Sequence, residues 1–182
     1  QQVVEAVHRA TRGEAFVATD VGQHQMFAAQ YYKFQRPNRW ITSGGLGTMG
    51  FGFPAAMGIK MFYPEADVVL FTGEGSFQMM MQEFSTCKQY GIGVKIINLN
   101  NQSLGMVRQW QDLNYKSRHS HSYMESLPDF VQLAGAYGFR AIKVHTVEEL
   151  EPALEEAFRN KDELVFLDIY VDPREHVYPM QV

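Results

Sequence analysis

The chain has 182 residues, of which 46% are hydrophobic, which suits one globular domain with a buried core. Its formal net charge is −4, from 16 basic and 20 acidic residues scattered without a polybasic run, which argues against a nucleic-acid partner. The longest apolar stretches, 68–72 and 94–99, are far shorter than the roughly 18 residues of a membrane span. The single cysteine, Cys87, has no partner for an internal disulfide, which predicts a reducing, cytoplasmic location and a small buried thiol.

In chain order, short apolar runs alternate with stretches of helical period, which is typical of a parallel α/β sheet. The first half predicts helices at 3–10, 25–34 and 53–62 and strands at 16–19 and 67–72. The second half predicts helices at 77–90, 129–137 and 147–160 and strands at 94–99, 141–144 and 164–171. We therefore expect one three-layer, doubly wound α/β domain over 1–182 with a mainly parallel sheet, in which the Met run 79–81 and Phe84 pack into the core.

The predicted loops at strand ends are where a ligand is expected. In doubly wound sheets, ligands bind in the crevice beyond the carboxyl ends of the strands, where the strand order reverses and adjacent loops diverge. Four loops qualify: 20–24, 43–50, 73–76 and 100–107. We expect at least some of them to meet at one site.

The segment 73–76, Gly-Glu-Gly-Ser, places a carboxylate between two glycines where a buried strand is expected to meet a helix. Glycines let the backbone approach an anion closely, and the start of a helix presents unpaired N–H groups with a favourable dipole. Glu74 would repel a diphosphate unless a cation lay between them, and Mg²⁺ commonly shares its oxygen ligands between protein and phosphates. Asn101 follows the next strand with an amide oxygen, and the carbonyl of Ser103 lies two residues beyond.

The pairing of Gly-Glu-Gly at 73–75 with Asn-Asn at 100–101 resembles the thiamine diphosphate motif, in which Gly-Asp-Gly is followed further along the chain by Asn. On that resemblance, Glu74, Asn101 and the carbonyl of Ser103 hold Mg²⁺, which in turn holds the diphosphate of thiamine diphosphate. Glu74 departs from the usual Asp of the motif. It keeps the charge and the ligand type but is one CH₂ longer, so the octahedral geometry of Mg²⁺ requires some accommodation.

Three further segments look like acetohydroxyacid synthase (acetolactate synthase): Asp-Val-Gly-Gln-His-Gln-Met at 20–26, Thr-Ser-Gly-Gly-Leu-Gly-Thr-Met-Gly at 42–50 and Gly-Met-Val-Arg-Gln-Trp-Gln at 105–111. The resemblance covers essentially the whole chain and corresponds to the C-terminal cofactor domain of the large catalytic subunit. It implies that the diphosphate pocket is lined by Val21, Gly22, Gln23 and His24. It implies that the aminopyrimidine is contacted by Gly47 and by Met49, which holds the cofactor bent. The other implied cofactor contacts are Gly73, Glu74, Gly75, Ser76, Asn101, Ser103, Leu104, Gly105, Met106 and Val107, and the implied substrate channel involves Met106, Val107 and Trp110.

The resemblance also implies what the larger protein does. Such enzymes decarboxylate pyruvate and condense the product with pyruvate or 2-oxobutyrate, on the route to valine, leucine and isoleucine. They carry FAD in a middle domain, and they form homodimers or homotetramers with the active site at a subunit interface, with a possible small regulatory subunit. The chain begins Gln1-Gln2 without Met, and it lacks the flavin domain and the activating glutamate of the family's N-terminal domain. We therefore expect a fragment that is inactive by itself.

Two other hypotheses remain. The segment 45–50 also fits Gly-x-Gly-x-x-Gly of nicotinamide-binding Rossmann units, although 39–43 is a poor buried strand and the expected acid would be Glu65 or Asp67 in a turn. Glu74 in place of Asp, together with the missing domains, would instead fit a non-catalytic module that serves only assembly. Some residues gain a functional role only through the resemblance, since each is also common in packing or structural roles: His24, Met49 and Trp110.

Overall fold

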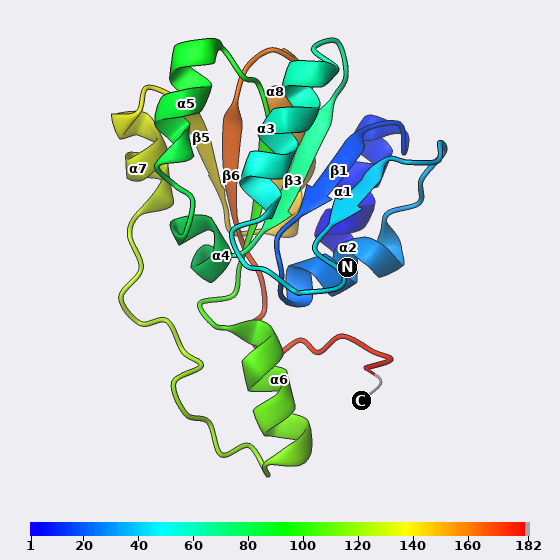
Figure 1. The fold of residues 1–182 in the computed structure, drawn as a ribbon. Helices are drawn as coiled ribbons and strands as arrows, with labels where there is room; N and C mark the ends of the chain where they lie inside the picture. Colours follow the sequence, from blue (N-terminus) through cyan, green and yellow to red (C-terminus); the bar gives the residue numbers. More distant parts are fainter. Residues whose placement is uncertain (181–182) are drawn as a thin grey trace.

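Six parallel strands form one sheet in the computed structural model, which describes residues 1–180 (Figure 1). The strands are β1 (Phe16–Thr19), β2 (Trp40–Thr42), β3 (Val68–Thr72), β4 (Lys95–Asn100), β5 (Arg140–Val144) and β6 (Val165–Tyr170). Their order across the sheet is β2-β1-β3-β4-β6-β5, and every neighbouring pair runs parallel. The predicted doubly wound α/β fold is confirmed.

Helices cover both faces of the sheet, giving the three expected layers (Figure 1). One face carries α1 (Gln2–Thr11), α2 (Gln23–Tyr31) and α8 (Val147–Phe158). The other face carries α3 (Gly52–Phe62), α4 (Glu74–Gln78), α5 (Glu83–Tyr90) and α7 (Phe130–Ala136). A further helix, α6 (Gly105–Asn114), stands beyond the end of the sheet. Within residues 1–180, no helix is long and apolar enough to cross a membrane.

The central strands are apolar on both sides because each face has its own core. In β3, Val69 and Phe71 pack with α1, α2 and α8, whereas Val68 and Leu70 pack with the helices of the opposite face. This burial on both sides explains why the strand reads as a continuous apolar run rather than as an alternating pattern. Cys87 is buried in the second core as a free thiol, as predicted.

The predicted helix at 77–90 is wrong, because the chain forms two helices with a tight turn between them. The backbone N–H groups of residues 79, 80 and 83–85 bond to carbonyls three positions earlier, a spacing that winds the chain more tightly than an α-helix. The turn carries Met79 and Met81 to the surface, where they are 52% and 36% exposed. The prediction that the Met run packs into the core is therefore wrong for Met79 and Met81. Phe84 is fully buried, as predicted.

The sequence analysis did not predict two elements of the secondary structure, β2 and α6. Strand β2 is a half-buried edge strand that pairs only with β1, so its apolar signal is weak. Helix α6 begins at Gly105, inside the segment 100–107 that we expected to be a loop. Its buried positions are Arg108 and Gln109, which are polar, so a search for apolar periodicity does not find them.

The strand order reverses between β1 and β3, and this reversal positions the site. The chain leaves β1 towards β2 on one side and leaves β3 towards β4 on the other. Helix α2 follows β1 and covers one face of the sheet, whereas α4 follows β3 and covers the opposite face. The two connecting loops therefore diverge, which leaves a crevice at the carboxyl ends of these strands.

Candidate cofactor site

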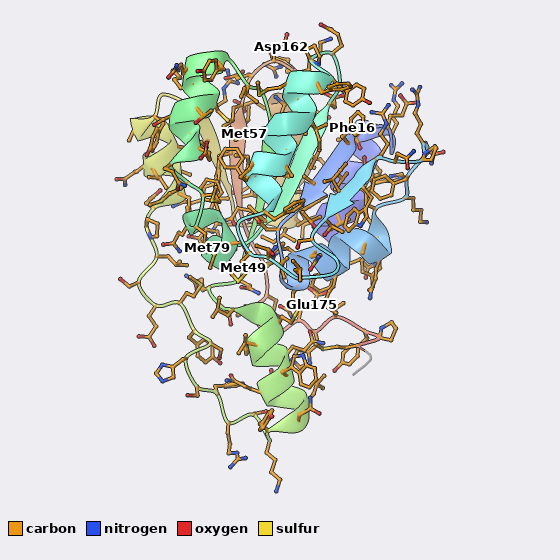
Figure 2. The ribbon with its side chains drawn as sticks, in the orientation of Figure 1. Phe16, Met49, Met57, Met79, Asp162 and Glu175 are labelled. Atoms are coloured by element: carbon orange, nitrogen blue, oxygen red, sulfur yellow. The ribbon has the colours of Figure 1, made fainter. Side chains whose placement is uncertain are left out.

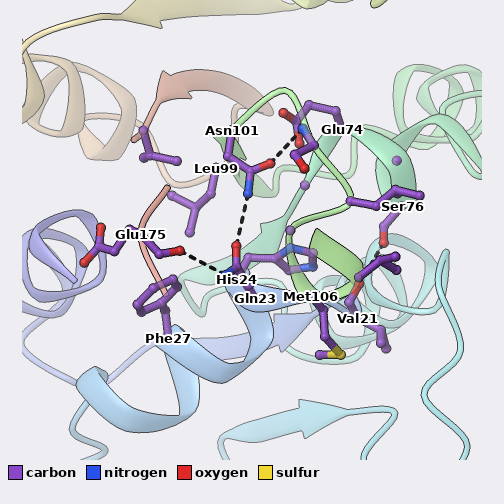
Figure 3. A pocket seen from close by; sticks show the side chains of 18 of the residues that line it. Val21, Gln23, His24, Phe27, Glu74, Ser76, Leu99, Asn101, Met106 and Glu175 are labelled. Atoms are coloured by element: carbon purple, nitrogen blue, oxygen red, sulfur yellow. Dashed lines mark hydrogen bonds between the residues drawn. The ribbon is translucent and has the colours of Figure 1, made fainter. Parts of the chain in front are cut away.

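A cavity lies in this crevice, walled by the loops after β1, β3 and β4, by the start of α6 and by the segment after β6 (Figure 3). Figure 2 shows Met49 and Glu175 at this end of the sheet and Asp162 at the far end. The predicted cofactor residues that line the cavity are Val21, Gly22, Gln23, His24, Met49, Gly73, Glu74, Gly75, Ser76, Asn101, Ser103, Leu104, Gly105, Met106 and Val107. Sequence segments more than 50 positions apart thus meet at one place.

Two of the predicted residues lie outside the lining of this cavity. Gly47 stands in an exposed loop, although a Cβ built on it would lie 3.8 Å from a side-chain carbon of Val21. Trp110 is half-buried on α6, beyond Met106 and Val107. The implied roles of Gly47 at the aminopyrimidine and of Trp110 at the substrate channel stay predictions.

Glu74 and Asn101 converge in the cavity from neighbouring strand ends (Figure 3). Glu74 is the first residue of α4, its side chain is 1% exposed, and its carboxylate accepts a hydrogen bond from the backbone N–H of Gln102. Asn101 immediately precedes that residue, and its Oδ1 accepts from the backbone N–H of Ser103 at 3.0 Å. The loop after β4 is therefore folded around the carboxylate of Glu74, and the two predicted metal ligands share one environment.

Burial raises the pKa of the Glu74 carboxyl to about 7, because the carboxylate loses its hydration; hydrogen bonds from the backbone oppose the shift. A cation close to Glu74 would offset the free-energy cost of burying its charged carboxylate. Within residues 1–180, no three His, Cys, Asp or Glu side chains gather as a metal site, so a cation here would rest on one carboxylate with neutral oxygens. The predicted ligands Glu74, Asn101 Oδ1 with its second lone pair, and the Ser103 carbonyl would supply such donors, whose chemistry suits Mg²⁺.

The imidazole ring of His24 lies between two glycines, Gly22 and Gly73, and all three residues line the cavity. A Cβ on Gly22 would lie 2.8 Å from the His24 ring, and one on Gly73 would lie 2.9 Å from its Nδ1, so neither position has room for a side chain. Burial lowers the pKa of His24 to about 3, against an opposing hydrogen bond with the backbone of Asp20. The ring is therefore neutral near pH 7, and its Nε2 is buried without a partner among the described residues.

Asp20 braces the loops that form the cavity rather than lining it. Its Oδ1 accepts from the backbone N–H of Gly52 at 2.8 Å, and its Oδ2 accepts from the hydroxyl of Thr72 at 2.7 Å. The side chain is fully buried, and this desolvation raises the pKa of its carboxyl. Ser76 adds a second tie, since its hydroxyl donates to the carbonyl of Val21 at 3.2 Å. The hydrogen bonds of Asp20 and Ser76 therefore hold the loops after β1 and β3 together.

Gln23 joins three parts of the site. Its Nε2 donates to Oε1 of Gln109 at 2.8 Å. The same Nε2 donates to the carbonyl of Glu175 at 3.0 Å, and Oε1 of Gln23 accepts from Nδ2 of Asn101 at 3.2 Å (Figure 3). A Cβ on Gly105 would overlap both the Gln23 oxygen and the Asn101 nitrogen. Glycine is therefore needed at Gly105 for this contact between two side chains to form.

The structure adds residues to the cavity that sequence reasoning missed. Leu99, Val171 and Asp172 lie at the carboxyl ends of β4 and β6, so extending the strand-end rule to β6 could have found them. Phe27 lies one helical turn after Gln23 on α2, a spacing that also predicts a shared face. No local pattern in the sequence indicates the others, which are Gln1, Val3 and Glu175.

Comparison with known proteins agrees with this geometry. Residues 20–169 match the family model described as "Thiamine pyrophosphate enzyme, C-terminal TPP binding domain". The chain belongs to this family of thiamine diphosphate-binding domains. It is 64% identical over 182 residues to the acetolactate synthase large subunit of Haemophilus influenzae, covering 100% of this chain and 32% of that protein.

Similarity of the same kind extends to other organisms. The chain is 59% identical to the acetolactate synthase isozyme 3 large subunit of Escherichia coli, over 100% of this chain and 32% of that protein. It is 43% identical to the chloroplastic acetolactate synthase 3 of Brassica napus, over 99% of this chain and 28% of that protein. The chain thus spans about a third of the length of such relatives, and the resemblance to acetolactate synthase large subunits is confirmed.

The family match and the fold also decide against the nicotinamide hypothesis. A Rossmann unit needs its Gly-x-Gly-x-x-Gly in the tight turn that leaves a central strand. Here the segment 45–50 follows β2, a half-buried edge strand, and most of it is exposed.

Proposed function

We propose that this chain is the thiamine diphosphate- and Mg²⁺-binding domain, over residues 1–182, of the large catalytic subunit of an acetolactate synthase. One observation carries the proposal. The carboxylate of Glu74 and the amide of Asn101 line one cavity together with almost all the residues that the resemblance assigns to the cofactor. The names of the relatives support the reaction: decarboxylation of pyruvate and condensation with pyruvate or 2-oxobutyrate, in branched-chain amino acid biosynthesis.

Each group of the cavity has a defined task in this proposal. Glu74, Asn101 Oδ1 and the carbonyl of Ser103 hold Mg²⁺, and loss of the Glu74 proton accompanies metal binding. The glycine-lined backbone around Gly73 and the start of α4 face the diphosphate. When bound, thiamine diphosphate supplies the electron sink that the decarboxylation of a 2-oxo acid requires. His24 is neutral and lines the cavity, where its Nε2 is buried without a hydrogen-bond partner among the described residues.

The rest of the catalytic machinery lies elsewhere in this proposal. The activating glutamate comes from an N-terminal domain, FAD from a middle domain, and the active site lies at the interface of a homodimer or homotetramer. A small regulatory subunit is consistent with the words "large subunit" in the names of the relatives. A cytoplasmic location is supported by the single buried free thiol of Cys87. The 182-residue chain alone is then inactive.

Calorimetry on the full-length protein tests the proposal. We expect thiamine diphosphate to bind only with Mg²⁺, pyruvate to be consumed with formation of acetolactate, and both to disappear on chelation and return with added Mg²⁺. A full-length protein that folds but neither binds the cofactor nor consumes pyruvate would instead be a non-catalytic assembly module. Turnover by the isolated chain would contradict the expectation that the activating glutamate lies outside it.

A further inference from the structure

Gln109 is a fully buried polar residue on α6, and it lies outside the residues that line the cavity. Its Nε2 donates to the carbonyl of Val177 at 2.8 Å, and its Oε1 accepts from the backbone N–H of Val177 at 2.9 Å. One side chain thus satisfies both backbone groups of a residue in the segment after β6. Val177 is itself fully buried, so these groups have no water to replace the bonds.

The Gln109 side chain is also connected to the candidate cofactor site by hydrogen bonds through Gln23. Oε1 of Gln109 also accepts from Nε2 of Gln23 at 2.8 Å, and Oε1 of Gln23 accepts from Nδ2 of Asn101 at 3.2 Å. These bonds fix which end of each amide faces its neighbour, because a donor must meet an acceptor at every step. With its nitrogen turned towards Gln23, Asn101 presents its oxygen, Oδ1, on the side of Ser103 and Glu74.

We propose that Gln109 is a positioning residue, which orients the metal-binding amide of Asn101 through Gln23 and is itself held by the backbone of Val177. The inference rests on the proposed function, since it takes Asn101 Oδ1 as a ligand of Mg²⁺. Gln109 touches neither cofactor nor reacting atoms. It acts by keeping the amide oxygen of Asn101 turned towards the metal and the amide nitrogen turned away.

A second attachment of the same segment supplies a control. Asp112, one helical turn after Gln109 on α6, accepts from the ring of His176 at 2.9 Å, so it also ties the segment to α6. Asp112 bonds to neither Gln23 nor Asn101 among the contacts of the described residues. Removing the charge of Asp112 weakens this second attachment and therefore separates general attachment of the segment from orientation of Asn101.

The experiment compares Gln109→Met with Asp112→Asn in the full-length protein. Met keeps the length and volume of Gln but removes its hydrogen bonds to Gln23, to both backbone groups of Val177 and to the sulfur of Met180. Loss of a group that orients a metal ligand typically weakens metal affinity roughly 10- to 100-fold, and we expect a loss in that range for Mg²⁺ in the presence of thiamine diphosphate. Since Gln109 does not touch the reacting atoms, saturating Mg²⁺ restores kcat to within about twofold of the unmodified protein. We expect Asp112→Asn to change Mg²⁺ affinity by no more than about twofold.

Three results would overturn the inference: unchanged Mg²⁺ affinity in Gln109→Met, a kcat that stays low at saturating Mg²⁺, or equal losses in Gln109→Met and Asp112→Asn. Should Gln109→Met fail to fold, Gln109→Asn is measured instead. It keeps the amide but is too short to reach Val177 and Gln23 together, and the same criteria apply. Failure of the unmodified protein to bind Mg²⁺ and thiamine diphosphate would count against the proposed function, whereas a difference confined to the variants speaks only to Gln109.

Discussion

The segments 73–76 and 43–50 are both rich in glycine, and the resemblance assigns residues of both to the cofactor, yet they differ in the structure. Segment 73–76 leaves the central strand β3 and enters α4 at once, with Glu74 and Ser76 each 1% exposed. Segment 43–50 leaves the edge strand β2, and Leu46 at its centre is 94% exposed. Glycines therefore form a buried site here only where neighbouring strands and helices on both sides supply its walls.

The largest expected effect comes from the buried carboxylate. Glu74→Gln in the full-length protein replaces a charged Mg²⁺ ligand by a neutral one, and we expect a loss of metal affinity of at least about 100-fold. The matched control is Glu65→Gln, at a carboxylate whose side chain is 84% exposed. Calorimetric titration with Mg²⁺ and thiamine diphosphate measures both. Equal affinities in Glu74→Gln and the unmodified protein would remove Glu74 from the metal site.

Adding one methyl group to each segment tests whether the two differ in available space. A Cβ on Gly73 would press on the buried ring of His24, whereas a Cβ on Gly45 meets nothing within 4 Å. Overpacking typically costs about 1–3 kcal/mol, so we expect Gly73→Ala to weaken cofactor binding about tenfold or more. Gly45→Ala should leave it within about twofold. Similar losses in both variants, measured by titration with thiamine diphosphate, would contradict the contrast between the two segments.

The pH dependence of metal binding tests the burial of Glu74 directly. Burial raises the pKa of this carboxyl to about 7, so below that pH the site holds a proton that Mg²⁺ must displace. Mg²⁺ affinity is therefore expected to be constant above about pH 7 and to fall as the pH is lowered, by about tenfold per pH unit. Calorimetry between about pH 8 and pH 5.5 measures it. A profile that stays flat down to pH 5.5 would mean that Glu74 keeps an ordinary pKa.

The smallest effect is expected at Trp110, which lies outside the cavity on a half-buried face of α6. We expect Trp110→Leu to alter the preference between pyruvate and 2-oxobutyrate as acceptor, or the binding of inhibitors, by a few-fold. Stability should change by about 1 kcal/mol or less. Competition between the two acceptors and thermal unfolding measure these effects. A variant unaltered in both acceptor preference and inhibitor binding would count against a channel role for Trp110.

Much of the fold was predictable because central strands carry strong local signals. The runs in β3 and β4 are apolar on both faces, and the glycines and polar residues that follow them mark where the strands end. The break between α4 and α5 was not predictable, because its i→i−3 hydrogen bonds leave the helical pattern of the sequence unchanged. Helix α6 was missed because its buried residues, Arg108 and Gln109, bury hydrogen-bonding groups instead of apolar surface.

Local patterns in the sequence were enough to predict the parallel α/β class, the position of the Gly-Glu-Gly turn and the resemblance to acetolactate synthases, since each depends on neighbouring residues or on matching segments. The folded chain was needed to show that Glu74 is desolvated, that His24 lies between Gly22 and Gly73, and that Gln109 links Val177 to Gln23. Burial and hydrogen-bond partners such as these arise between segments far apart in the chain, once the sheet has brought its strand ends together.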